Sequence, residues 1–167
     1  MSAIKLKGNE IHTSGHLPEK GALALEFKLT RSDLNDVVLE DFAGKRLILN
    51  VFPSIDTPVC AASVRRFNQE AGRLSNCVVL CISRDLPFAH ARFCGAEGIA
   101  NVVTLSEFRV DDFGLAYGLK IVDGPLTGLF SRSVIILDES HRIIYTEQVP
   151  EIGQEPDYTA ALNALNQ

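Results

Sequence analysis

One cysteine of this chain lies where an apolar strand pattern gives way to a helical one. In residues 53–60 (PSIDTPVC), Thr57 is a suitable helix N-cap, and Pro58 falls at the first helical position, where a missing N–H breaks no bond. Cys60 then occupies the third helical position, beside unpaired amides and the positive end of the helix dipole. This environment favours the thiolate, which is the reactive form. Cys60 is therefore a candidate nucleophile.

A cation close to the sulfur would favour the thiolate further. No motif connects the histidines with Cys60, which argues against a Cys–His protease pair. Arg132 is the better candidate, because arginine stays charged and offers a fork of donors. It directly precedes the apolar run 133–137, and a strand beside the central one would bring it to the Cys60 turn. For Thr57 two roles stay open: N-cap only, or also a hydroxyl that bonds the sulfur or an incoming oxygen.

The other three cysteines have different surroundings. Cys94 lies near the end of a second predicted helix, where it is either a small packed side chain or a resolving thiol that condenses with a sulfenic acid on Cys60. Cys81 lies inside an apolar strand pattern and is expected to be buried, whereas Cys77 begins that strand and is expected to be partly exposed. No C-x-x-C spacing occurs, which argues against a structural zinc site and against a thioredoxin-like reductase.

Composition restricts the classes of partner. The 167 residues fit one domain, with 46% hydrophobic and 22% charged residues. The net charge is −5 and the basic residues are spread along the chain, which predicts no nucleic-acid partner and no membrane surface. No signal-peptide pattern opens the sequence, so the cytoplasm is the expected location, with export to the periplasm by another route left open. The glycine-containing segment 123–128 lacks the Lys-Ser/Thr of a phosphate loop and is interpreted as a structural turn.

Hydrophobic periodicity predicts the elements that position these residues. An N-terminal hairpin is expected from 3–7 and 10–14, and a closing hairpin from 133–137 and 142–146. Short strands are expected at 27–30 and 37–39, and buried strands at 46–52, 78–83 and 102–105. From residue 60 the period is helical, with an apolar face at 64, 67, 71 and 74, and further helices are expected over 87–94 and 156–165. Residues 106–131 are expected to be loop-rich. The order βαβαβ followed by ββα predicts an α/β protein with a thioredoxin-like fold and an N-terminal β-hairpin extension, its central mixed sheet flanked by helices.

The motif around Cys60 also carries a family resemblance. Pro53, Thr57 and Cys60 match the P-x-x-x-T-x-x-C motif of peroxiredoxins. Segments 50–57 (NVFPSIDT), 60–68 (CAASVRRFN), 85–89 (DLPFA) and 92–98 (RFCGAEG) resemble the bacterial thiol peroxidases, an atypical two-cysteine branch of that family. The N-terminal hairpin, the DGPL loop at 123–126 and the EPDY segment at 155–158 extend the similarity over essentially the whole chain.

The resemblance implies a mechanism and a set of partners. It implies a single thioredoxin-like peroxiredoxin domain over residues 1–167, in which Cys60 is the peroxidatic cysteine and Cys94 the resolving cysteine of the same chain. Thr57 and Arg132 would complete the peroxide site, and Pro53 would shield it from bulk water. The implied activity is reduction of hydrogen peroxide and organic hydroperoxides, with recycling by thioredoxin. The family implies a homodimer and neither a metal nor an organic cofactor.

Two other classes of function fit the same residues. The chain could be a redox sensor or chaperone-type binding module, oxidised by peroxide but passing the signal to a partner. It could also be a structural thioredoxin-like module with four inert thiols. Multiple turnover with thioredoxin separates the enzyme from the first alternative, and unequal reactivity of the thiols separates it from the second.

Overall fold

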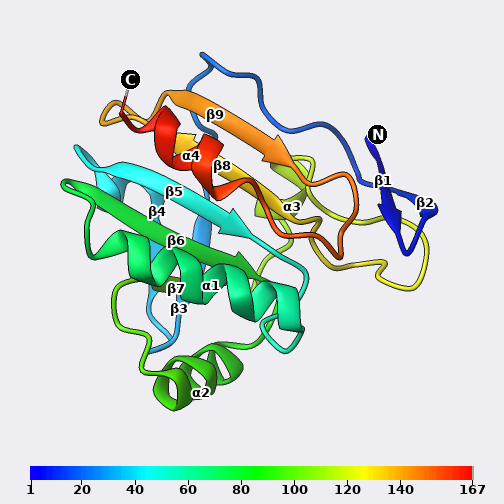
Figure 1. Cartoon of the computed structure of the whole chain (residues 1–167), viewed down its shortest axis with the longest axis horizontal. Coiled ribbons are helices and arrows are strands. Elements are labelled where there is room, and N and C mark those ends of the chain that lie inside the picture. The colour runs from blue at the N-terminus through cyan, green and yellow to red at the C-terminus, as the bar shows by residue number, and fades with distance from the viewer. Residues whose placement is uncertain (167) are drawn as a thin grey trace.

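A seven-stranded mixed sheet forms the centre of the computed structural model, which describes residues 1–166. Its strand order is β4-β3-β7-β6-β5-β8-β9, and β1 and β2 form a separate hairpin (Figure 1). The strands are β1 (Ala3–Leu6), β2 (Asn9–His12), β3 (Lys28–Arg31), β4 (Asp36–Val38), β5 (Arg46–Val51), β6 (Cys77–Ser83), β7 (Val103–Ser106), β8 (Ser133–Leu137) and β9 (Ile143–Gln148). The helices are η1 (Leu39–Phe42), α1 (Pro58–Ala71), α2 (Pro87–Glu97), α3 (Phe113–Ala116) and α4 (Tyr158–Ala164).

Strand β5 lies in the middle of the sheet and leads directly to the Cys60 turn. It pairs in parallel with β6 and antiparallel with β8. Because side chains alternate between the faces of a strand, Leu47, Leu49 and Val51 join the hydrophobic cluster on one face, while Ile48 joins the cluster on the other. A central strand buried on both faces explains the nearly continuous apolar run of this segment.

The two faces of the sheet are covered by different elements. Helices α1, α2 and α4 pack on one face, which is the near side in Figure 1, and their cluster includes Cys60, Phe67 and Phe93. The opposite face is covered by α3 and by the segment around Phe27, with Phe113 in that cluster. Helix α1 packs on β6 and α2 on β7, so the helices that carry Cys60 and Cys94 lie over neighbouring strands.

The predicted fold class is confirmed: the sheet is mixed, helices flank it, and the N-terminal hairpin is present. Two short helices were not predicted. Residue 39 begins η1 instead of ending a strand, and the carboxylate of Asp41 accepts the backbone N–H of Val38 at 2.8 Å. Helix α3 falls in the segment expected to be loop-rich; four residues are too few to display a helical period. Within residues 1–166, no helix has both the length and the apolar composition that crossing a membrane requires.

Helix α1 also ends earlier than its apolar pattern suggested. The helix stops at Ala71, and Gly72 forms the C-cap. Leu74 lies beyond the end of the helix, yet it packs against the same hydrophobic cluster as Phe67. Its apolar side chain therefore reflects partial burial and not membership of the helix. Periodicity alone does not distinguish these two situations, because both place an apolar side chain on the same face.

Candidate active site

Cys60 lies in the first turn of α1, as the N-terminal motif predicted. Thr57 is the N-cap residue with extended backbone angles, and Pro58 begins the helix. The Ala61 N–H donates to the Thr57 carbonyl at 3.0 Å and opens the helical ladder, so the amide of Cys60 precedes the intrahelical hydrogen bonds. The Cys60 side chain is fully buried, with 0% of its surface exposed. The sulfur therefore lies at a helix N-terminus and inside the protein.

The structure brings Arg132 to this sulfur. Its Nη1 atom donates to Cys60 Sγ at 3.4 Å, and its Nε atom donates to the carbonyl of Ile152 at 2.8 Å. The register of β5 and β8 accounts for the approach, because Val51 pairs with Ser133, the residue that follows Arg132. Only 3% of Arg132 is exposed. A guanidinium held at two nitrogens and removed from water interacts strongly with a nearby thiolate.

Thr57 is at the predicted N-cap position, but its side chain does not cap the helix. Its hydroxyl instead donates to the Ser54 carbonyl at 2.9 Å. A threonine hydroxyl carries a single hydrogen, so the oxygen can take part in further hydrogen bonds only as an acceptor. The expected capping bond is therefore wrong, and the hydroxyl is left able to accept a hydrogen from a molecule that approaches it.

An apolar pocket of about 280 Å³ opens beside these residues. Three residues of the predicted site, Pro53, Thr57 and Arg132, contribute to its wall, together with Leu6, Ser54, Pro58, Val59, Leu126, Leu129, Ile152 and Gly153. Cys60 does not line the pocket. Arg132 does, and its guanidinium contacts the Cys60 sulfur, so Arg132 connects the pocket with the sulfur. Pro53 is itself buried, which places it between the strand end and the pocket. The pocket is lined mostly by aliphatic side chains and has one cation in its wall.

The N-terminal hairpin supports the Arg132 side of the pocket. The Glu151 carboxylate accepts the amides of Lys7 and Gly8, each at 3.0 Å. The Ile152 N–H donates to the Lys5 carbonyl at 2.9 Å, and the Ile152 carbonyl in turn accepts from Arg132. These bonds fix the acceptor that orients the guanidinium. Ile152 was not singled out from the sequence, because a backbone carbonyl carries no signal of residue type.

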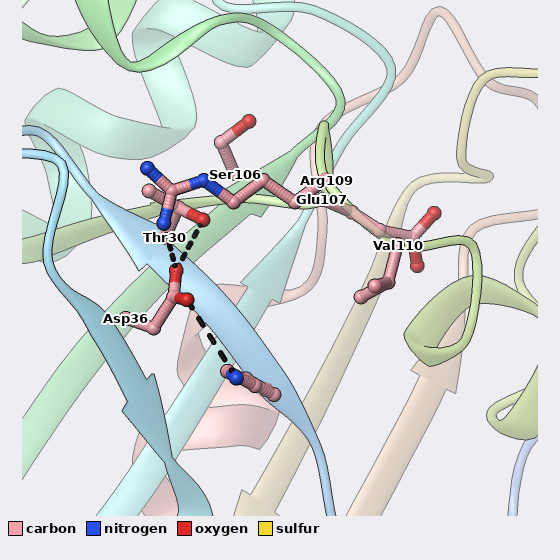
Figure 2. Close-up of a pocket in the computed structure, with 7 residues that line it drawn as sticks. Thr30, Asp36, Ser106, Glu107, Arg109 and Val110 are labelled. Carbon is pink, nitrogen blue, oxygen red and sulfur yellow. Dashed lines mark hydrogen bonds and ion pairs between the residues drawn. The ribbon is translucent and has the colours of Figure 1, made fainter.

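A second, smaller pocket of about 120 Å³ lies near the β4 edge of the sheet and contains none of the predicted site residues. Figure 2 shows Asp36 facing the Thr30 hydroxyl and the Arg109 guanidinium, which donate to it at 2.7 and 2.9 Å. These contacts hold the pKa of Asp36 below its usual value, mainly through the Thr30 hydrogen bond. Thr30, Asp36 and Arg109 thus bond one another, and the residues that line this pocket include no cysteine.

The remaining thiols have surroundings unlike that of Cys60. All four cysteines are free, and Cys94 is half-buried on α2. Burial raises the pKa of Cys94, raises that of Cys77 to about 11 and raises that of Cys81 to about 12. Cys81 is buried and Cys77 partly exposed, as predicted. A high pKa leaves little thiolate near neutral pH, so these three thiols are poor nucleophiles in this conformation.

Comparison with known proteins decides the family. The model of the Redoxin family matches residues 19–162, and a thiol peroxidase of Corynebacterium glutamicum is 52% identical over 99% of this chain and 100% of its own length. The chain belongs to the redoxin family. Within that family it falls among the thiol peroxidases, so the protein is an enzyme, a thiol-dependent peroxidase of the peroxiredoxin type.

Solved structures of redoxins agree with this fold. A peroxiredoxin-like protein of Aquifex aeolicus superposes with a TM-score of 0.93 at 33% identity, covering 99% of this chain and 96% of that one. A thiol peroxidase of Chromobacterium violaceum gives 0.91 at 23% identity with the same coverage, a likeness that concerns the fold alone. The predicted family is thereby confirmed, while the roles of individual residues rest on the geometry described above.

Proposed function

We propose that residues 1–167 form one catalytic domain that reduces hydroperoxides with Cys60 and closes its cycle with Cys94. The observation that carries this proposal is the buried guanidinium of Arg132, 3.4 Å from a sulfur at a helix N-terminus. Both features favour the thiolate, and the same donor can stabilise charge that develops on a peroxide oxygen.

In the first step, the Cys60 thiolate attacks the terminal oxygen of ROOH. An S–O bond forms, the O–O bond breaks, and the alkoxide leaves as ROH after taking a proton. Arg132 and the Cys60 amide donate to the two oxygens, while the Thr57 hydroxyl accepts the hydrogen of the hydroperoxide. Donors fixed before the reaction lower the barrier without reorganising during it. Because the sulfur is fully buried, side chains of the pocket wall must shift slightly to admit the substrate, while the turn itself stays in place.

In the second step, the Cys60 sulfenic acid condenses with the Cys94 thiol. The S–O bond breaks, an S–S bond forms, and the thiol proton leaves with the hydroxyl group as water. A thiolate of thioredoxin then attacks this disulfide, and exchange returns both cysteines to thiols. The disulfide requires Cβ atoms about 4 Å apart, and Cys60 is enclosed in α1, so the first turn of α1 or part of α2 must move.

The pocket supports organic hydroperoxides as the preferred class. Its aliphatic walls, contributed among others by Leu6, Val59 and Leu126, would bury the R group of ROOH, while Arg132 faces its polar end. Burial of apolar surface contributes about 25 cal/mol for each Å². Hydrogen peroxide has no such group, so we expect a smaller second-order rate constant for it than for an alkyl hydroperoxide.

Mass spectrometry after rapid quenching tests the proposed cycle. One equivalent of cumene hydroperoxide should link Cys60 with Cys94 in the wild-type protein, and Cys60→Ser should consume none. Cys94→Ser should consume about one equivalent and stop as a sulfenic acid. Ordinary turnover of Cys60→Ser would overturn the assignment, and sustained cycling of Cys94→Ser would transfer the resolving role to another thiol.

Alkylation tests the alternative of four inert thiols. With limiting iodoacetamide near pH 7, we expect Cys60 to react first and Cys81 last, because Arg132 contacts the Cys60 sulfur whereas burial raises the pKa of Cys81 to about 12. Equal, slow labelling of all four would favour the structural module. For the redox-sensor alternative the measurement is turnover: failure of thioredoxin to support more than one turnover would favour it.

We also propose a cytoplasmic homodimer. Four free thiols suit a reducing compartment. At the start of α2, Leu86 and Phe88 are 52% and 66% exposed, an apolar pair that a second copy would cover. Analytical ultracentrifugation at micromolar concentration should give the mass of two chains, and Phe88→Asp should shift it toward one. A wild-type monomer under these conditions would refute the dimer.

A further inference from the structure

Asp85 lies between the two segments that carry the proposed reactive cysteines. Its Oδ1 atom accepts the Ser54 hydroxyl at 2.8 Å, and its Oδ2 atom accepts the Ile55 amide at 2.8 Å. Both donors belong to the turn between β5 and α1 that leads to Cys60. The Ser83 hydroxyl also donates to Oδ2, at 2.6 Å, from the end of β6. One carboxylate therefore ties the Cys60 turn to the connection that begins α2.

On the Cys60 side, this carboxylate reaches the substrate pocket through Ser54. The Ser54 carbonyl accepts both the hydroxyl and the amide of Thr57, at 2.9 and 3.2 Å. The position of Ser54 thus sets the direction in which the Thr57 oxygen presents its lone pairs. Because Asp85 fixes Ser54 and Ile55 together, it determines the geometry of the turn from which both Thr57 and Cys60 follow.

On the α2 side, the carboxylate reaches His90 through Ser83. His90 is fully buried, and its Nε2 atom lies 2.8 Å from the Ser83 hydroxyl oxygen. The single hydrogen of Ser83 is already donated to Asp85, so Nε2 must be the donor to Ser83. Nδ1 of His90 has no hydrogen-bond partner among residues 1–166. Burial lowers the pKa of His90, although the nearby Asp85 carboxylate acts in the opposite direction. The lowered pKa favours the neutral ring.

This order of donors distinguishes the cluster from a hydrolytic triad. In a triad the carboxylate orients the histidine, and the histidine takes the proton of the serine. Here the histidine donates to the serine, and the serine donates to the carboxylate. Ser83 is also completely buried. The chain from His90 through Ser83 to Asp85 is therefore suited to holding segments together and not to activating a nucleophile.

An exposed ion pair spans the same two segments but is a weaker connection. Arg92 on α2 donates to Asp56 in the Cys60 turn at 2.6 Å, and the two side chains are 65% and 60% exposed. Solvent and salt screen such pairs, so they contribute little to stability. Only 11% of the Asp85 side chain is exposed, so its charge-assisted bonds are the main polar connection between the segments.

We propose that Asp85 is a positioning residue that acts on the two chemical steps in opposite directions, a role that rests on the proposed Cys60–Cys94 cycle. For peroxide reduction it holds Ser54, Thr57 and Cys60 in the reactive arrangement. For disulfide formation the same bonds must break, because the first turn of α1 cannot unwind while Ser54 and Ile55 are attached to Asp85. The carboxylate thus favours the first step and delays the second.

The test is Asp85→Asn, compared with Asp36→Asn as a matched control. Asparagine offers one acceptor oxygen in place of two and no charge, so at least one of Ser54 and Ile55 loses its acceptor. Asp36 likewise accepts from a hydroxyl, that of Thr30, and from the Arg109 guanidinium, with 26% of its side chain exposed, but at the far pocket shown in Figure 2. Rapid quench with cumene hydroperoxide, followed by sulfenic-acid trapping and mass spectrometry, measures each step separately.

For Asp85→Asn we expect peroxide reduction to slow about tenfold, since sub-ångström misplacement of reacting groups is costly. We expect disulfide formation to accelerate about tenfold, as loss of a hydrogen bond to a charged group loosens the turn. Asp36→Asn should change neither rate. Equal slowing of both steps, no change in either, or a change in only one overturns the proposal.

Hydrogen exchange and a milder variant keep the test decisive if Asp85→Asn does not fold. Ser54→Ala removes one of the two turn donors and should change the two rates in the same opposite directions, by smaller factors. The amides of residues 54–57 should exchange faster in that variant than in wild type. A wild-type protein that never links Cys60 with Cys94 would instead refute the proposed function, before any variant is compared.

Discussion

Replacing Arg132 tests the central electrostatic argument directly. Two variants separate charge from geometry: Arg132→Lys keeps a positive charge, whereas Arg132→Gln removes it. In the wild-type protein Nε and Nη1 hold the Ile152 carbonyl and the Cys60 sulfur at the same time. A lysine ammonium is a point charge on a flexible stem, so it cannot reproduce this fork. Any difference between the two variants therefore measures how much of the effect is charge alone.

The separation of the two groups gives the size of the effect. At 3.4 Å, a thiolate and a guanidinium attract by about 5 kcal/mol at an effective dielectric constant of about 20. Removing the buried cation from water offsets part of this attraction. Loss of one preorganised donor typically slows a reaction about 100- to 1,000-fold, and we expect this range for Arg132→Gln. For Arg132→Lys we expect about tenfold, because charge is retained and orientation is lost.

Rapid quench under pseudo-first-order conditions gives the second-order rate constant of Cys60 with cumene hydroperoxide. Absorbance at 240 nm, compared with the Cys60→Ser protein, reports the thiolate present near neutral pH. We expect Arg132→Gln to lose thiolate absorbance and rate together, and Arg132→Lys to lose more rate than absorbance. Wild-type rate constants in both variants would show that the contact at the sulfur has no part in the reaction.

Two further predictions concern the pocket and the core. Leu126→Asn should reduce the rate constant with cumene hydroperoxide about tenfold and that with hydrogen peroxide much less, because only the organic substrate uses the apolar wall; equal reductions would exclude a role in substrate preference. Burial raises the pKa of Glu107 to about 7, so its proton stabilises the fold below about pH 4.5 and that stabilisation is lost as the pH rises through 7. Glu107→Gln, which keeps an acceptor for the Gly114 amide, should gain up to about 3 kcal/mol relative to wild type between pH 4.5 and 8. Urea unfolding at both pH values measures this difference, and a constant difference would contradict it.

The position of Cys60 could be predicted from the sequence because its signals are local. A threonine, a proline and a change from strand to helix period occur within a few residues, and each has a meaning fixed by backbone geometry. The approach of Arg132 needed one further inference, that the strand after it lies beside β5. The pairing of Val51 with Ser133 shows that this inference was correct.

Other parts of the site depend on hydrogen bonds whose partners cannot be identified from the sequence. From the sequence, the Thr57 hydroxyl could donate to the Cys60 sulfur or to a nearby backbone carbonyl. Only the fold shows that it donates to the Ser54 carbonyl. Ile152 acts through a backbone carbonyl, which any residue possesses. Asp85 lies in a recognisable segment, but its bonds to Ser54 and Ile55 cross 31 and 30 positions. Long-range contacts of this kind arise from strand order, which periodicity does not determine.

The four thiols have surroundings that, on the proposed mechanism, would make a single cysteine reactive. Burial raises the pKa of Cys77, Cys81 and Cys94, and within residues 1–166 no cation offsets this effect at Cys81. Cys60 is buried as completely as Cys81, yet it meets a guanidinium and the first amides of a helix. Burial alone would suppress the reactivity of Cys60, and the same burial strengthens the attraction of a thiolate to Arg132 once that cation is present. The proposed selectivity for Cys60 therefore depends on where the cation and the helix N-terminus are placed, since exposure to solvent does not distinguish Cys60 from Cys81.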